Sequence, residues 1–274
     1  HSTSRRQRQM CIRDRFAADV LETPIDNISV YGVDTDISPY DSGSYASSTT
    51  YLTGMAAVKA CEQLRERIIA LAAVRMNKDA SALTFDGENV IDESDGAKMS
   101  LFDIATASMC NNEISLEVTY SHSSPVSPPP FMAACAEIEA DPETGAIELL
   151  DYTACVDCGT VVNTNLARVQ TEGGLLQGIG MTLYEDIWYD ERGKNLSNSF
   201  MQYKVPSRLD TDRIRVEFDS SYEPTGPFGA KSIGEIVINT PAPAIADAVY
   251  NATGVWINEL PITPEKILKG MKVI

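Results

Sequence analysis

Four glycines interrupt one of the most regular apolar patterns in this 274-residue sequence. Apolar residues spaced three and four apart predict a helix over residues 165–184, and the glycines within it are Gly173, Gly174, Gly178 and Gly180. Each glycine costs about 0.8–1 kcal/mol relative to alanine in a helix, or roughly 3–4 kcal/mol for the set. Something must therefore approach this backbone closely. Two explanations stay open: tight packing of another element, or a flat ligand hydrogen-bonded by Gln170 and Gln177.

The other segments predict both helices and antiparallel strands. Apolar residues recur at helical spacing over residues 51–71, whereas residues 132–140 and 146–156 alternate like the two strands of a hairpin. Residues 80–112 read as a small strand, a turn and a short helix. Four prolines between residues 121 and 130 favour an extended connector. We therefore expect a mixed α/β fold of the α+β kind.

The composition excludes several classes of protein. Acidic residues outnumber basic ones 39 to 22, and a net charge of −17 argues against a nucleic-acid partner or an anionic membrane. No run approaches the roughly 18 apolar residues of a membrane-spanning helix. The chain has only two histidines, which are too few for a histidine-rich metal site. The Cys155–Cys158 pair lacks two further ligands nearby, so we interpret both residues as ordinary cysteines. The expected location is the cytoplasm.

The first fifteen residues differ from the rest of the chain. They contain five arginines, one aspartate and no apolar periodicity, and no apolar segment follows as in a secretory signal. We expect residues 1–15 to be a non-native or disordered leader, and the natural chain to begin well upstream.

Hydroxyl side chains cluster before the helix predicted at residues 51–71. Ser47, Ser48, Thr49 and Thr50 lie where helix N–H groups lack partners, an arrangement that favours a phosphate oxygen. The alternative is N-capping, which needs only one hydroxyl.

Residues 226–235 invite comparison with a phosphate loop, but the match fails. A P-loop needs glycines where Thr225 and Ala230 stand, and the Gly178-Ile-Gly180 segment has Leu183 in place of the third glycine of a dinucleotide fingerprint. Glu235 then follows a glycine-punctuated loop and precedes an apolar segment. Taken alone, this pattern favours a loop charge over a general base.

Seven motifs in order change that interpretation. They are Asp34-Thr-Asp-Ile-Ser-Pro-Tyr-Asp-Ser-Gly-Ser-Tyr-Ala-Ser-Ser-Thr-Thr-Tyr-Leu-Thr-Gly54, Val156-Asp-Cys-Gly-Thr-Val-Val-Asn163, Gln170-Thr-Glu-Gly-Gly174, Gln177-Gly-Ile-Gly180, Tyr203-Lys-Val-Pro206, Gly229-Ala-Lys-Ser-Ile-Gly-Glu235 and Leu260-Pro-Ile-Thr-Pro-Glu-Lys-Ile267. From about residue 16 onward the chain strongly resembles the C-terminal part of the molybdenum subunit of the xanthine dehydrogenase and aldehyde oxidoreductase family. It is most similar to bacterial purine, xanthine and nicotinate dehydrogenases.

The resemblance implies a molybdenum hydroxylase. Its metal would be held by the dithiolene of molybdopterin, in the cytosine dinucleotide form, without a protein ligand, which fits the shortage of histidine. The enzyme would hydroxylate an N-heterocycle or an aldehyde with water-derived oxygen. Electrons would leave through partner subunits that carry a 2Fe-2S cluster and FAD. The family's Gly-Gly-x-Phe-Gly segment, oxo-facing glutamine and substrate-clamping arginine belong to the N-terminal half of the subunit, which is therefore a further expected partner.

The resemblance also assigns roles to residues. Glu235 corresponds to the general base, and Gln170 to a glutamine that hydrogen-bonds the cofactor near the metal. The remaining expected cofactor contacts are Tyr45, Ala46, Ser47, Ser48, Thr49, Thr50, Asn163, Gly173, Gly174, Gln177, Lys231 and Gly234. Asn163 is also the expected cap of the glycine-rich helix, because Asn163-Thr164 replaces the family's usual Asn-Pro.

Two interleaved lobes are expected for such a molybdopterin-binding domain. The first would combine residues 16–110 with residues 225–274, and the second would span residues 111–224. The alternative to an enzyme is a noncatalytic assembly or binding module that keeps the fold without the cofactor.

Overall fold

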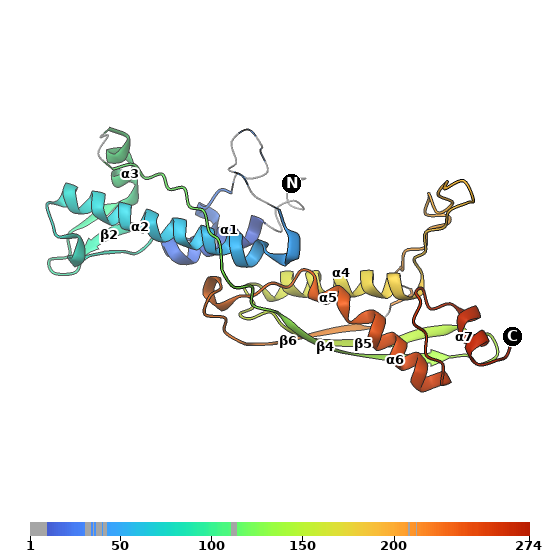
Figure 1. The fold of residues 1–274 in the computed structure, drawn as a ribbon. Coiled ribbons are helices and arrows are strands. Elements are labelled where there is room, and N and C mark those ends of the chain that lie inside the picture. Colours follow the sequence, from blue (N-terminus) through green and yellow to red (C-terminus); the bar gives the residue numbers. More distant parts are fainter. Residues whose placement is uncertain are drawn as a thin grey trace. The chain divides into compact units, whose positions relative to one another are not determined.

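The computed structural model describes residues 10–30, 34, 36, 40, 43–110, 114–207, 209–211 and 213–274. They form two compact units (Figure 1). The first unit contains the described residues up to Ser127 together with Thr225–Phe228, and the second contains Pro128–Pro224 and Gly229–Ile274. Much of the first family motif, before Gly43, lies outside the described residues.

The first unit is built on two helices and a small sheet. Helix α1 (Met10–Leu21) packs along α2 (Gly54–Met76), and α3 (Leu101–Cys110) follows a three-stranded antiparallel sheet of order β1-β2-β3. The strands are β1 (Leu83–Phe85), β2 (Asn89–Asp92) and β3 (Lys98–Ser100). Short 3-10 turns at Ile25–Asn27, Tyr45–Ser47 and Ala80–Ala82 and a π-helical turn at Thr49–Thr53 complete it. Ile68 and Leu71 of α2, Phe85, Val90 and Ile104 are buried together, so one core joins helices and sheet.

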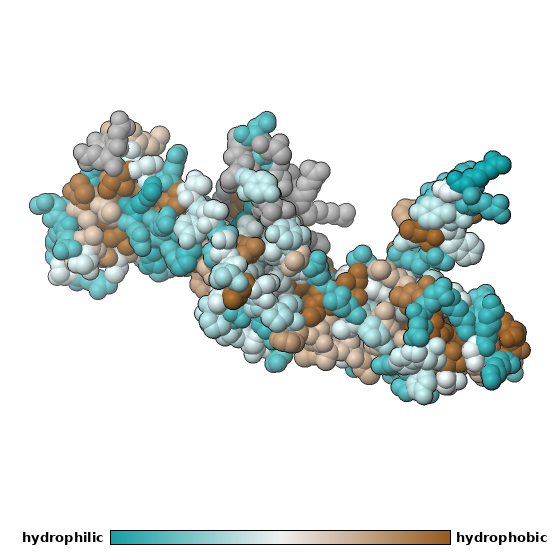
Figure 2. Space-filling model, in the orientation of Figure 1, coloured by the Kyte–Doolittle hydropathy of each residue, from teal (hydrophilic) through white to brown (hydrophobic). Residues whose placement is uncertain are grey.

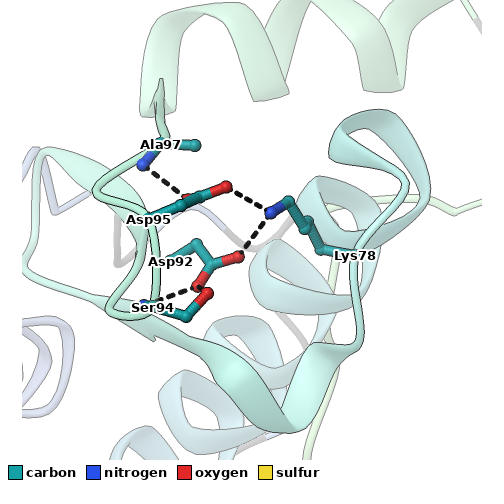
Figure 3. A network of polar contacts seen from close by, with 5 residues as sticks. All are labelled: Lys78, Asp92, Ser94, Asp95 and Ala97. Atoms are coloured by element: carbon teal, nitrogen blue, oxygen red, sulfur yellow. Dashed lines mark hydrogen bonds and ion pairs between the residues drawn. The ribbon is translucent and has the colours of Figure 1, made fainter.

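A buried carboxylate fastens the end of α2 to the sheet (Figure 3). The helix ends at Asn77, which is left-handed at φ 53°, and Lys78 Nζ then lies 2.9 Å from Asp92 Oδ2 and 2.5 Å from Asp95 Oδ2. The Ser94 hydroxyl and backbone N–H donate to the other Asp92 oxygen. The bonds from Ser94, followed by the one from Lys78, lower the pKa of Asp92 to about 2.

The second unit is a three-stranded sheet covered on one face by helices. β4 (Phe131–Ala140) pairs antiparallel with β5 (Ile147–Asp157), which pairs parallel with β6 (Ile214–Asp219). Helix α4 (Thr164–Leu183) lies between β5 and β6 in the chain, and α5 (Ile236–Asn239), α6 (Pro241–Thr253) and α7 (Pro264–Gly270) follow β6. A 3-10 turn at Pro227–Gly229 lies where the chain passes from the first unit back to the second. Tyr152, Leu175, Ile179, Val216 and Ile245 are among the residues buried between the sheet, α4 and α6.

Local features of the sequence predicted this architecture well. The mixed α/β class is confirmed, the hairpin turns at residues 141–145, and the glycine-rich helix runs over Thr164–Leu183. Asn163 is its N-cap, because its Oδ1 accepts the N–H of Leu166 at 2.9 Å. Within the predicted leader, residues 10–15 are helical and belong to α1, while residues 1–9 lie outside the described part.

The predicted lobe boundaries also differ from the observed units. We expected residues 225–274 to join residues 16–110, but only Thr225–Phe228 do so, and Gly229–Ile274 belong to the second unit. The physical reason is that α6 packs on β4 and its Ile245 and Val249 enter the core beneath the sheet. The connector before Pro128 is grouped with the first unit. No helix among the described residues is both long and apolar enough to cross a membrane.

Candidate functional site

The predicted cofactor loop of the first unit has a strained backbone. Ala46 and Ser47 lie at φ 49° and 57°, in the left-handed region that non-glycine residues avoid at about 1–2 kcal/mol each. The next residues, Thr49–Thr53, form a π-helical turn that runs directly into α2. Both features concentrate at functional sites, where the surrounding structure holds them in place.

The hydroxyl groups of this loop are not used as helix caps. Ser44, Ser48 and Thr53 occupy the N-cap positions of the successive helical turns, and none makes a side-chain cap hydrogen bond. The Ser44 and Thr49 hydroxyls instead lie 2.5 Å apart. These three N-cap positions therefore show no side-chain capping, and anion binding by the loop stays a prediction.

Buried contacts hold the end of the loop. Tyr51 is buried, and its hydroxyl donates to Thr225 Oγ1 at 2.7 Å and lies 3.1 Å from Ser124 Oγ. Three residues after Thr225, Phe228 stacks on Phe16 with ring centroids 5.8 Å apart. These contacts hold the start of α2, which directly follows the loop. The protein itself therefore helps to fix the conformation of the loop.

One face of α4 in the second unit is open. Thr171, Leu175 and Ile179 are buried toward the sheet, whereas Gln170, Gly173 and Gln177 are exposed on consecutive turns of the opposite face. The two glutamines thus present amide groups on either side of a residue without a side chain.

The glycines of α4 have two different explanations. A Cβ on Gly174 would overlap Val237 Cγ2 and lie 3.0 Å from Val237 Cβ, and one on Gly178 would lie 2.6 Å from Pro241 Cγ. Gly180 is similarly crowded by Glu185 and Pro206. A Cβ on Gly173 would meet nothing within 4 Å. Packing therefore accounts for three glycines and leaves Gly173 unexplained within the described residues.

This packing also orients the segment that carries Glu235. Val237 lies on Gly174 and Pro241 lies on Gly178, so α5 and the start of α6 follow α4 in the same direction. Gly234 and Glu235 come directly before this packed segment, two to three residues ahead of Val237. Glu235 occupies the N-cap position of α5, makes no cap hydrogen bond and is exposed.

Lys231, in the same loop, is buried in an ion pair. Its Nζ lies 2.7 Å from Asp157 Oδ2 at the end of β5, and its side chain is only 8% exposed. Burial alone would raise the pKa of Asp157, but bonds from Lys231, Ser221 and the Gly159 N–H outweigh it and lower that pKa. The ammonium is thus already engaged by a protein carboxylate.

Comparison with known proteins identifies the family. The family described as molybdopterin cofactor-binding domain matches residues 14–212. The chain belongs to this family. It is 38% identical over 262 residues to the probable hypoxanthine oxidase XdhD of Escherichia coli K12, covering 95% of this chain and 27% of that protein. It is 31% identical to the xanthine dehydrogenase molybdenum-binding subunit of Escherichia coli O157:H7, covering 92% and 34%.

A solved structure has a similar fold. The fold is similar to that of quinoline 2-oxidoreductase from Pseudomonas putida 86, with a TM-score of 0.82 at 26% identity over 95% of this chain and 34% of that one. This molybdopterin-binding chain therefore spans about a third or less of the length of the relatives it matches.

The structure groups the predicted site residues in two sets, one in each unit. Residues 45–50 form the strained loop of the first unit. The second unit carries Asn163, the exposed face of α4, Lys231, Gly234 and Glu235. Among the described residues, no group of three His, Cys, Asp or Glu side chains is arranged to hold a metal ion. Sequence reasoning missed Asp157 and Val237, although Asp157 stands inside one of the quoted motifs.

Proposed function

We propose that this chain is the cofactor-binding part of a molybdenum hydroxylase subunit. The observation that carries the proposal is the open face of α4, where Gln170, Gly173 and Gln177 are exposed and a Cβ on Gly173 would meet nothing within 4 Å. Gly173 lowers the helix propensity of α4, and no packing contact among the described residues explains it. The missing side chain leaves room for a flat ligand. Membership of a molybdopterin cofactor-binding family supports molybdopterin as the proposed ligand.

The residues present fit this cofactor. The amides of Gln170 and Gln177 can donate to and accept from the pterin, and the absent side chain at Gly173 leaves room for its ring edge. Hydroxyls and backbone N–H groups of residues 45–50 suit the phosphates of the cytosine dinucleotide form. When bound, the cofactor supplies two-electron oxidation chemistry at molybdenum.

Glu235 is the proposed general base. Its carboxylate is exposed, so it can accept a proton from a water or hydroxyl beside the open face of α4. A carboxylate base in this role contributes roughly 10²–10⁴-fold to the rate.

The proposed substrate is an N-heterocycle. The names of the similar proteins refer to hypoxanthine, xanthine and quinoline, which are all nitrogen heterocycles. The proposed partners are the remaining N-terminal part of the molybdenum subunit and subunits carrying a 2Fe-2S cluster and FAD. Large hydrophobic side chains are exposed in both units, among them Phe102, Trp188 and Phe200, and they support such partners. Figure 2 shows hydrophobic patches, in brown, at the surface of the molecule.

The test is reconstitution in cells. The chain is co-expressed with the N-terminal part of a related molybdenum subunit and with iron–sulfur and FAD subunits, and molybdenum content and hypoxanthine or quinoline oxidation are measured. Glu235→Gln should keep its molybdenum and lose at least about 100-fold in kcat. Glu143→Gln, in the exposed hairpin turn, is the matched control and should behave as wild type.

Two outcomes would contradict the proposal. If Glu235→Gln keeps the wild-type rate, Glu235 is not the base. If the wild-type assembly never acquires molybdenum, the enzyme hypothesis fails and the noncatalytic binding module becomes the better description.

A further inference from the structure

The Lys231–Asp157 pair of the second unit makes several hydrogen bonds besides the ion pair itself. Lys231 Nζ lies 2.7 Å from one Asp157 oxygen and 5.3 Å from the centroid of the Phe131 ring. The other Asp157 oxygen accepts the Ser221 hydroxyl at 2.6 Å and the Gly159 N–H at 2.9 Å. A buried charge so satisfied holds its neighbours in one arrangement, and removing one partner leaves the other charge without compensation.

The same site ties two backbone segments together. The Lys231 N–H donates to Cys158 O at 2.8 Å, and the Thr160 N–H donates to Gly229 O at 2.9 Å. Gly159 and Ala230 form an antiparallel bridge between these bonds. The start of the loop is therefore attached to the end of β5, four residues before Glu235.

The far side of the loop is anchored separately. Val237, two residues after Glu235, is fully buried against Gly174 of α4. Glu235 thus stands between two buried anchors, and the ion pair supplies one of them.

We propose that Lys231 is a positioning residue, whose ion pair with Asp157 fixes the loop that presents Glu235, and that it does not bind the cofactor itself. This rests on the proposed function for the role of Glu235 as base. The role proposed here differs from the sequence prediction, which placed Lys231 in contact with the cofactor. Because the two charges compensate each other, removing either Lys231 or Asp157 should disturb the loop that carries Glu235 in the same way.

The first experiment uses this 274-residue chain without cofactor. Amide hydrogen exchange is followed at Thr160 and residue 231 in Lys231→Met, Asp157→Asn and the double variant. Each single variant should lose at least about tenfold in protection, and the double variant should recover to within about threefold of wild type, because no buried charge is then left unpaired. Lys194→Met, an exposed lysine of the same unit, is the control. Unchanged exchange in both single variants would overturn the proposal.

The second experiment uses the assembled enzyme. Lys231→Met and Asp157→Asn should both keep their molybdenum and the KM for substrate, and both should lose about tenfold or more in kcat, with Lys231→Arg recovering part of the loss. A lysine that bound the cofactor would give another result: molybdenum content would fall in Lys231→Met only, which would overturn the proposal. If even wild type lacks molybdenum, the proposed function fails, and the exchange experiment still decides whether the pair holds the loop.

Discussion

Replacing each of two adjacent glycines in α4 by alanine should have opposite effects on stability. Gly173→Ala adds a methyl group where nothing lies within 4 Å, whereas Gly174→Ala places the same group into the buried Val237 side chain. Both variants gain the same helix propensity, so the difference between them isolates the packing contact.

The expected magnitudes follow from these contacts. Gly173→Ala should raise the free energy of unfolding of the second unit by about 0.8–1 kcal/mol, the helix propensity of alanine over glycine. In Gly174→Ala this gain is opposed by overpacking of about 1–3 kcal/mol. Val237 is β-branched and fully buried, so it cannot rotate away cheaply, and the upper part of that range applies. The net loss should be about 2 kcal/mol, and the two variants should differ by about 3 kcal/mol.

Tryptophan fluorescence is a suitable assay, because Trp188 and Trp256, the two tryptophans of the chain, both lie in the second unit. With about 2–4 °C per kcal/mol, the two variants should melt about 6–12 °C apart. Adding Val237→Ala should relieve the overlap, so a double-mutant cycle with Gly174→Ala should show a favourable coupling of about 1–2 kcal/mol. Equal melting temperatures for the two glycine variants would refute the packing argument.

The same pair separates stability from cofactor binding. In the assembled enzyme, Gly173→Ala should fold at least as well as wild type yet hold less molybdenum, because its methyl group intrudes on the open face. A stabilised variant with unchanged molybdenum content would mean that no ligand lies against Gly173.

Three further predictions concern the cap, the strained loop and pH. Asn163→Ala should cost the second unit about 1 kcal/mol in chemical denaturation, whereas Asn163→Asp should keep most of that stability because it keeps the cap; equal losses would exclude capping. Ala46→Gly should raise the unfolding free energy of the first unit by about 1 kcal/mol, measured by circular dichroism, and lower the molybdenum content; a loss of stability would mean that position 46 carries no strain. Because the pKa of Asp92 is lowered to about 2, its stabilising contribution is complete above about pH 4 and is lost as the pH falls through 2. Asp92→Asn should therefore flatten the acid limb of the melting curve of the first unit, and an unchanged acid limb would contradict the role of Asp92.

The sequence predicted the elements whose signals are local. Helix α4 and its Asn163 cap, the hairpin and α2 each follow from periodicity, a capping side chain or turn residues within about twenty positions. The lobe boundaries did not follow, because they depend on α6 packing against β4, some hundred residues away along the chain. The Lys231–Asp157 bond joins residues 74 positions apart, and nothing in either local pattern indicates it.

Backbone strain was equally hidden from the sequence. Ala46 and Ser47 adopt left-handed conformations that their residue types disfavour, so only the folded loop shows them. The glycine pattern predicts a total propensity cost for α4 but cannot divide that cost between packing and an open face. Propensity is the same at Gly173 and Gly174, and only the neighbouring atoms distinguish them.

The arrangement around Glu235 bears on the choice between a loop charge and a base. A solvated loop charge requires no support, and such loops tolerate motion because they bury few contacts. Here the flanking residues are both buried, Lys231 against Asp157 and Val237 against Gly174, while the carboxylate between them remains exposed. Gly174 costs the helix about 1 kcal/mol relative to alanine, and its missing side chain makes room for Val237. The buried ion pair adds little net stability compared with an apolar pair of similar volume. Two such costs on either side of one exposed carboxylate favour a side chain that is held in place for a reaction.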